Sequence, residues 1–129
     1  DACDDYENID DRRYNFSVGL EPMKPNVFKY MIEDVLKTIT YGEDYLSVAY
    51  CPVREDGISC IQSQAEETDG LHYLEIIIND DSEKGFKIYA REDLSLMDTI
   101  AIYRKVLIEY EMPSILDWED VTEKVQYVE

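Results

Sequence analysis

The sequence predicts an α+β domain in which an antiparallel sheet of about five strands, joined as a meander, carries two main helices on one face. Three observations lead to this fold class. Four β-prone runs follow one another with short acidic connections, one helical apolar pattern precedes them, and a second follows them. The 129 residues, 45% of them hydrophobic, are enough for one domain with its own core.

The most apolar of these runs covers residues 71–79, and we expect it to be an inner strand. Side chains alternate between the two faces of a strand, which puts Leu74, Ile76 and Ile78 on one face together with His72. This face should meet the helices. The opposite face is amphipathic, as in a sheet that is covered on one side and partly wet on the other.

The remaining strands show the same period-two pattern. We expect an edge strand at 14–20, further strands of the meander at 45–51, 58–64 and 86–91, and a last short strand around residues 125–128. The first thirteen residues hold six acids and few apolar side chains. We therefore expect a flexible acidic N-terminal segment at 1–13, followed by a single domain at 14–129.

Two helices are indicated by apolar residues at helical spacing. The first lies near 27–41, and Gly42 follows it in the position that favours glycine after a helix. The second covers about 96–111. It opens on a capping box, in which Ser95 precedes Asp98 by three residues.

The net charge of −18, from 30 acidic and 12 basic residues, far exceeds what solubility requires. Such a surface disfavours nucleic acid and anionic membranes as direct partners. No apolar run reaches the length of a membrane span. The acids are dispersed along the chain, which indicates a charged folded surface rather than an acidic tail. We therefore expect a soluble protein with a basic protein partner.

Cysteine usage bears on the compartment. Cys3, Cys51 and Cys60 are an odd number, which fits reduced thiols in the cytoplasm better than a secreted disulfide framework. A bridge between Cys51 and Cys60, across a hairpin with its loop at 54–57, stays open as the alternative. The chain begins at Asp1 rather than Met, which leaves open whether a signal peptide preceded it.

No catalytic, cofactor or metal motif stands out, so we expect a non-enzymatic protein without catalytic, cofactor-binding or metal residues. His72, the single histidine, has no serine or cysteine at a nucleophile spacing and fits a partly buried strand position. The cysteines lack zinc-site spacing. The loop at 79–85 lacks the glycine and glutamate of an EF-hand. Calcium binding and a small carboxylate-based enzyme remain alternatives.

The acids also predict a binding site. In a meander, the connections at 43–44, 66–69 and 92–93 lie at one end of the sheet, where their carboxylates converge. Their field extends over about 8 Å in physiological salt and steers a basic partner. A solvated rim is the alternative. The candidate partner-binding residues are five of these acids and two tyrosines that we expect nearby as aromatic anchors: Glu66, Glu67, Asp69, Glu92, Asp93, Tyr73 and Tyr89.

The closing segment Pro-x-x-x-Asp-Trp-Glu-Asp, Pro113 to Asp120, should fold Ile115, Leu116 and Trp118 back onto the domain. With the acidic charge, the meander and the long helix, residues 14–125 resemble bacterial immunity proteins of contact-dependent and other polymorphic toxin systems. This resemblance implies an immunity-type protein that binds and neutralises a basic toxin, such as a nuclease, in the cytoplasm. A nucleic-acid-mimicking regulator from a mobile element is the alternative.

Overall fold

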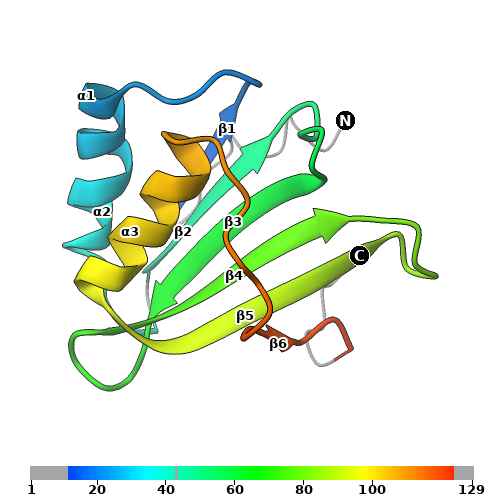
Figure 1. Cartoon of the computed structure of the whole chain (residues 1–129). Helices are drawn as coiled ribbons and strands as arrows, with labels where there is room; N and C mark the ends of the chain where they lie inside the picture. The colour runs from blue at the N-terminus through cyan, green and yellow to red at the C-terminus, as the bar shows by residue number, and fades with distance from the viewer. Residues whose placement is uncertain (1–11, 43, 124–129) are drawn as a thin grey trace.

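The computed structural model describes residues 12–42 and 44–123. It shows an α+β fold with helices on one face of a six-stranded mixed sheet (Figure 1). The strands lie side by side in chain order: β1 (Arg12–Val18), β2 (Asp44–Tyr50), β3 (Ile58–Ala65), β4 (Leu71–Asn79), β5 (Phe86–Ser95) and β6 (Glu119–Asp120).

The meander is confirmed for β2 to β5, which pair antiparallel in sequence order. The prediction of a wholly antiparallel sheet of about five strands is wrong at its first edge, where β1 pairs parallel with β2. A helical segment separates these two strands and carries the chain back over one face, so β2 starts at the same end of the sheet as β1. Alternation in the sequence shows which residues share a face but not the direction of pairing.

The first helical segment consists of α1 (Pro25–Phe28), a π-helical turn η2 (Lys29–Glu33) and α2 (Asp34–Leu36). It buries Phe28, Ile32 and Leu36 against the sheet. The predicted helix at 27–41 starts later and ends later than the observed one. The helix closes on a tight turn, in which the backbone N–H and the hydroxyl of Thr38 both donate to the Val35 carbonyl at 3.0 Å. Beyond this turn, the Asp44 carboxylate accepts hydrogen bonds from the backbone N–H and the hydroxyl of Thr40, at 3.0 and 2.9 Å.

The second helix, α3 (Leu96–Leu107), begins as predicted. The Ser95 hydroxyl oxygen accepts a hydrogen bond from the Asp98 backbone N–H at 3.0 Å. The helix ends four residues before the predicted boundary. Tyr110 then adopts a positive φ of 60°, which carries the chain away from the helix axis.

The segment after α3 crosses the edge of β5 and forms β6, which pairs antiparallel with β5. Trp118 is buried and Ile115 packs against the core, as predicted. Leu116 is 91% exposed, so its predicted packing is wrong. The Trp118 N–H donates to the Ile115 carbonyl at 3.1 Å, and this turn directs Leu116 outward. The strand predicted at 125–128 and most of the predicted flexible segment 1–13 lie outside the described residues.

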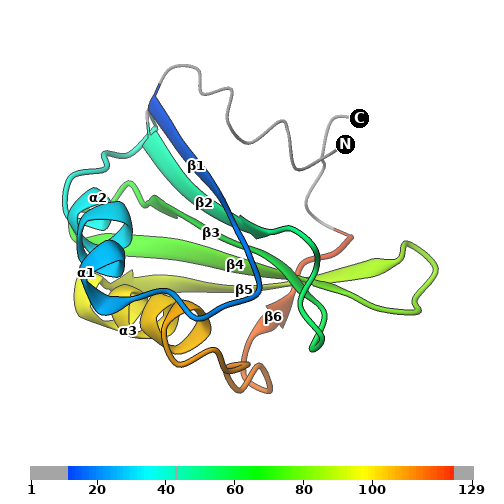
Figure 2. The same ribbon diagram turned by 90° about the horizontal axis from the view of Figure 1, so that it is seen from above.

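The core lies between the helices and one face of the sheet. Figure 2 shows α1, α2 and α3 on the same side. Leu74 and Ile76 are fully buried there, which confirms the predicted orientation of this strand. Tyr103 of α3 is also fully buried, and its hydroxyl lies 2.8 Å from the Ser63 hydroxyl. A smaller cluster around Ile88 covers part of the opposite face.

The cysteines differ from the expectation. Cys51 is disulfide-bonded, whereas Cys60 is a buried free thiol. The bridge between Cys51 and Cys60 is therefore wrong, and so is the expectation that all the thiols are reduced. Cys60 pairs with Ala49 across the sheet, and its sulfur lies 3.3 Å from the Ser47 hydroxyl. Burial raises the pKa of the Cys60 thiol to about 11, so this thiol is neutral at physiological pH.

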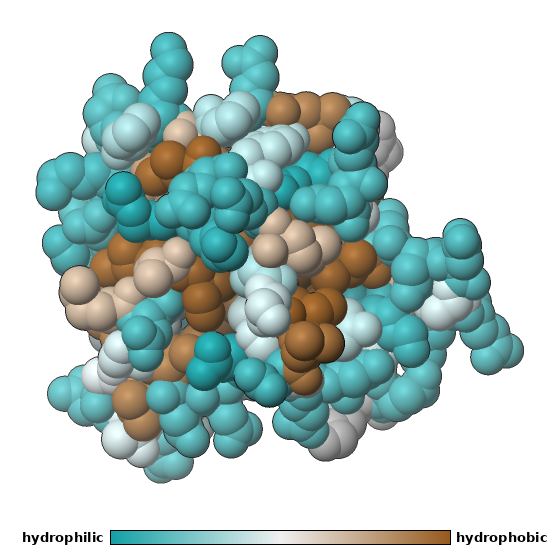
Figure 3. All heavy atoms as spheres, in the orientation of Figure 1, coloured by the Kyte–Doolittle hydropathy of each residue, from teal (hydrophilic) through white to brown (hydrophobic). Residues whose placement is uncertain are grey.

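The surface is mixed in polarity. In Figure 3, hydrophobic residues show between hydrophilic ones over the helical face, and the turn between β4 and β5 projects from the body as a hydrophilic lobe. Over the residues that the structure describes, no helix is both long and apolar enough to cross a membrane.

Candidate binding site at the acidic end of the sheet

The sheet end formed by the β3–β4 connection and the last residues of β5 carries most of the predicted site. The β3–β4 turn is closed by a hydrogen bond from the Glu66 N–H to the Leu71 carbonyl at 2.9 Å. Gly70 in this turn has a φ of +87°, a conformation that favours glycine. The Glu66 carboxylate accepts a hydrogen bond from the Asp93 backbone N–H at 2.5 Å. This bond ties the turn to the end of β5.

The acids at this end repel one another. Partial burial, followed by the negative charges of Asp93 and Glu92, raises the pKa of the Glu66 carboxyl above its ordinary value. Glu67 and Asp69 are exposed, and neither forms an ion pair with a basic side chain among the described residues. The cluster therefore keeps a local excess of negative charge.

A pocket of about 260 Å³ opens between this turn and the end of the first helical segment. We call it the acidic pocket. Glu66, Glu67 and Asp69 line one wall of it. Its other lining residues come from the end of α2 and the segment after it, from the end of β3, from the β3–β4 turn and from the starts of β4 and α3: Leu36, Lys37, Ile39, Thr40, Tyr41, Ala65, Gly70, Leu71, His72 and Leu96.

His72 is the buried polar member of the acidic pocket. This residue is 5% exposed, and its Nδ1 has no hydrogen-bond partner within the part of the chain that the structure describes. It alternates with Tyr73, so it lies on the helical face together with Leu74. Burial lowers the pKa of the His72 imidazole below its ordinary value. The ring is therefore neutral at physiological pH and keeps one nitrogen as an acceptor.

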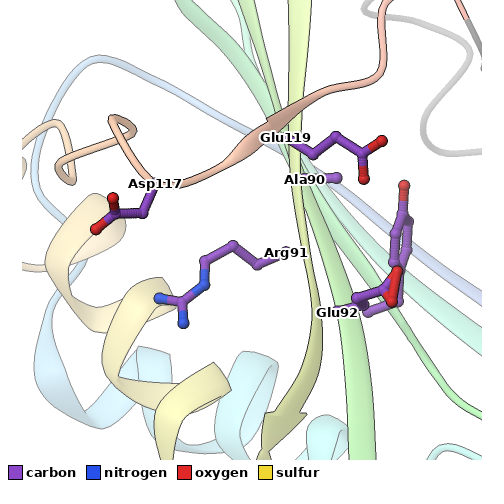
Figure 4. A pocket seen from close by; sticks show the side chains of 6 residues that line it. Ala90, Arg91, Glu92, Asp117 and Glu119 are labelled. Atoms are coloured by element: carbon purple, nitrogen blue, oxygen red, sulfur yellow. The ribbon is translucent and has the colours of Figure 1, made fainter.

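A second pocket, of about 230 Å³, lies along β5 and is lined by Glu92 and Tyr73 of the predicted set. We call it the edge pocket. Figure 4 shows Arg91 and Asp117 on one side of the β5 strand, with Glu92 and Glu119 on the other. The Tyr73 hydroxyl donates a hydrogen bond to the buried Glu75 carboxylate at 2.8 Å. Tyr73 thus belongs to a polar contact on the sheet face opposite the helices.

The structure therefore divides the predicted residues. Glu66, Glu67 and Asp69 share the acidic pocket, and Asp93 is attached to Glu66 through its backbone. Glu92 and Tyr73 line the edge pocket instead. Tyr89 lies in the middle of β5, away from the turns, and pairs with residues of β4 and β6.

Residues 36–41 and His72 were missed as site residues. The predicted helix extends to residue 41, so the sequence did not indicate that residues 36–41 leave the helix and line the acidic pocket. The only sequence signal for His72 was its place at the start of the strand face that meets the helices.

The described part of the chain holds no group of three histidine, cysteine or acidic side chains that is placed to bind a metal ion. In the β4–β5 turn, the Asp80 carboxylate accepts a hydrogen bond from the Ser82 backbone N–H at 2.9 Å, and hydrogen bonding from Ser82 lowers the pKa of Asp80. The Asp80 carboxylate thus stabilises the β4–β5 turn, the loop at 79–85 for which calcium binding was an alternative.

Glu75 is the one buried acid among the described residues. Its two oxygens accept hydrogen bonds from the Gln62 amide at 2.7 Å and from the Tyr73 hydroxyl. A carboxylate held in this way is suited to joining neighbouring strands.

No protein-family model matches the chain, and neither a curated protein nor a solved structure matches it.

Proposed function

We propose that this chain is a non-enzymatic acidic binding module of the immunity type, which binds and neutralises a basic toxin such as a nuclease. The observation that carries the proposal is the acidic end of the sheet, where Glu67 and Asp69 are exposed beside Glu66 and form no ion pair with a basic side chain of residues 12–42 or 44–123. The Glu66–Asp93 hydrogen bond fixes the turn that presents them. Carboxylates on an ordered turn lose less conformational entropy on binding than mobile ones.

Electrostatics explain how such a surface acts. A nuclease carries basic groups that face phosphates, and an acidic protein can occupy the same groups. The net charge of −18 supplies a long-range attraction, and the acidic end gives it a direction. A basic partner should therefore associate quickly at low salt and more slowly as salt increases.

A nucleic-acid-mimicking regulator would use the same charge against a different basic protein. It is the second candidate, because a surface rich in carboxylates fits either partner. The identity of the partner separates the two: a toxin domain supports the immunity function, and a DNA-binding regulator or nuclease of a mobile element supports the mimic. An enzyme based on Glu75 is less favoured, since both of its oxygens accept hydrogen bonds within the protein.

The compartment is part of the proposal. A cytoplasmic location suits an inhibitor of a nuclease that acts on the cell's own nucleic acid. The disulfide at Cys51 favours an oxidising compartment instead, because cytoplasmic thiols are kept reduced. Fractionation of native cells, with thiol labelling of the chain in each fraction, separates these two locations.

Charge reversal tests the acidic end. We expect the double variant E67K/D69K to associate more slowly with a purified basic partner, and with a weaker dependence on salt, because charges at the rim act mainly through the association rate. Stopped-flow kinetics at two salt concentrations measure both effects. Glu66 is left intact because its carboxylate holds the Asp93 N–H.

The matched control is D81K/E83K, which makes the same change of charge at the exposed β4–β5 turn, at the opposite end of the sheet. If both double variants slow association equally, the total charge directs the partner and the acidic end does not. If E67K/D69K associates like the parent, the binding surface lies elsewhere.

A further inference from the structure

We infer that two copies of this chain associate by pairing the outer edges of their β1 strands antiparallel, so that their two sheets become one. This surface is separate from the acidic end of the sheet, and the inference does not rest on the proposed function. Three observations carry it: the open backbone edge of β1, the scarcity of acids around this edge, and a register in which the strand pairs with itself.

The first observation is the outer edge of β1, which faces no other strand among the described residues. The Val18 carbonyl accepts a hydrogen bond from the Cys51 N–H at 3.1 Å, so the backbone groups of Val18 point toward β2. Backbone groups alternate in direction along a strand, and those of Asn15 and Ser17 therefore point away from β2. In Figure 2, β1 lies in front of the other strands, and no described segment crosses over it. An open edge of this kind is a template for pairing with another strand.

The charges at the two edges of the sheet differ. Proteins commonly protect an exposed edge with charged side chains or proline. At the far edge, β6 consists of two exposed acids, Glu119 and Asp120, which would face like charges in a second copy. The sequence of β1 is RRYNFSV, without an acid or a proline, and its two arginines stand together at its start. Antiparallel pairing places the arginines of the two copies at opposite ends of the interface.

Acids are also scarce beyond the strand itself. Residues 12–32 include one acid, Glu21, and four basic residues, in a chain that has 30 acids and 12 basic residues. Lys24 and Lys29 of this segment are exposed and form no ion pair with an acid of residues 12–42 or 44–123. A net charge of −18 makes two copies repel each other, and the repulsion is weakest where acids are few. A basic partner gains no attraction from this segment, so the edge suits a second copy of this acidic chain.

β1 can pair with itself along its full length. The middle residue of Arg12–Val18 is Asn15. When the two Asn15 residues lie opposite each other in an antiparallel pair, Ser17 of each copy lies opposite Arg13 of the other copy. The outward backbone groups of both strands then face one another and exchange N–H···O hydrogen bonds. The helices of both copies lie on the same face of the joined sheet, because a two-fold axis perpendicular to the sheet relates the two strands.

This register also pairs aromatic side chains. Alternation puts Tyr14 on the same face of β1 as Phe16, which packs against the core. Tyr14 is 36% exposed, and in the dimer it lies opposite Phe16 of the other copy. Aromatic pairs at opposite positions of neighbouring strands are stabilising. With one seven-residue strand from each copy, the interface is small, so we expect a weak dimer that dissociates on dilution.

Sedimentation velocity of the isolated full chain measures the association, at concentrations from micromolar to millimolar and at two salt concentrations. We expect a dimer whose fraction increases with protein concentration. The fraction should also increase with salt, because salt screens the repulsion between two acidic copies. Deuterium exchange of backbone amides, followed by NMR, locates the interface. Exchange of the Asn15 and Ser17 amides should slow as the dimer forms, because these N–H groups gain acceptors.

Substitutions at Asn15 test the self-pairing, since this residue meets its own counterpart. N15E and N15K each place two like charges directly opposite one another, which should weaken the dimer about twofold to fivefold. An equimolar mixture of N15E and N15K should associate more tightly than either variant alone. N15K is the decisive variant, because it lowers the net negative charge and would strengthen association through any other acidic surface. The matched controls N79E and N79K make the same exchanges at exposed Asn79, at the end of β4, and should dimerise like the parent.

Four results would refute the pairing of two copies through β1. A chain that stays monomeric at millimolar concentration in both salts has no such dimer. A dimer that N15K leaves unchanged or strengthens forms through another surface. Slow exchange of the Asn15 and Ser17 amides in the dilute monomer means that a segment of the same chain covers the edge. Slow exchange only after addition of a basic protein assigns the edge to that partner. None of these results bears on the acidic end, which E67K/D69K tests separately.

Discussion

Arg54 provides the sharpest test of how this fold is held together. Its side chain is 1% exposed, although it is charged. One terminal nitrogen donates to the Val106 carbonyl at 2.7 Å, near the end of α3, and the other donates to the Asp56 carboxylate at 2.8 Å. The guanidinium lies 4.0 Å from the centre of the Tyr110 ring. Arg54 thus fastens the β2–β3 connection to the C-terminal end of a helix, where a cation is favoured.

Replacing Arg54 by methionine keeps the apolar length of the side chain and removes its donors and charge. Loss of the hydrogen bond from the charged guanidinium to the Val106 carbonyl costs about 1.5–3 kcal/mol, although the carbonyl keeps the longer bond from the Tyr50 hydroxyl at 3.3 Å. Loss of the contact with Tyr110 costs about 0.5–2 kcal/mol. The ion pair with Asp56 adds about 0.5 kcal/mol, because the Asp56 side chain is 31% exposed and screened by solvent. We therefore expect the free energy of unfolding to fall by about 3 kcal/mol.

Urea denaturation followed by the fluorescence of Trp118, the single tryptophan, measures this change. Lysine at position 54 keeps the charge but lacks the planar fork, so we expect roughly half the loss. The control is K84A, which removes an exposed ion pair with Glu123 and should cost under about 0.5 kcal/mol. If R54M is as stable as K84A, Arg54 does not stabilise the contact between the β2–β3 connection and α3.

Three further predictions concern stability. I76A should lower the free energy of unfolding by about 2–5 kcal/mol in urea denaturation, which is more than the loss in I77A, because Ile77 is only half-buried on the opposite face. Equal losses in the two variants would show that Ile76 of β4 does not pack in the main core. S95A should cost about 1 kcal/mol in the same assay through loss of the bond from Asp98, and an unchanged midpoint would show that the cap contributes nothing. Because the pKa of His72 is lowered in the folded protein, the unfolded chain takes up a proton more readily below pH 6.5, and the free energy of unfolding decreases as the pH is lowered. The melting temperature should therefore drop between pH 7.5 and pH 5.5, and it should drop less in H72Q than in the parent. An equal drop in both proteins would exclude His72 as the cause.

Local patterns predicted the parts of the fold that depend on neighbours in sequence. Alternation in β4 identified the face that carries Leu74 and Ile76, because a strand has only two faces. The cap at Ser95 needs a partner three residues away, so it too is visible in the sequence. The parallel pairing of β1 depends on the direction in which the chain returns after a helix, and alternation is the same for either direction.

The candidate site was predictable only in part. The convergence of Glu66, Glu67 and Asp69 follows from the order of connections in a meander. Tyr89 was placed near these turns because the strand was expected to end at residue 91, whereas β5 continues to Ser95, past a positive φ at Asp93. The wall at 36–41 depends on the end of the first helical segment at Leu36, after which the Thr40–Asp44 hydrogen bonds hold the chain in a non-helical conformation.

The two edges of the sheet should form late and open first. The strands β2 to β5 meet their neighbours through short connections, so they can assemble from local hairpins. β1 has one neighbouring strand, separated from it in sequence by the helical segment, and β6 consists of two residues. Backbone amides in these outer strands should therefore exchange with solvent deuterium faster than those of β3 and β4, because local opening of an edge leaves the central hairpins intact.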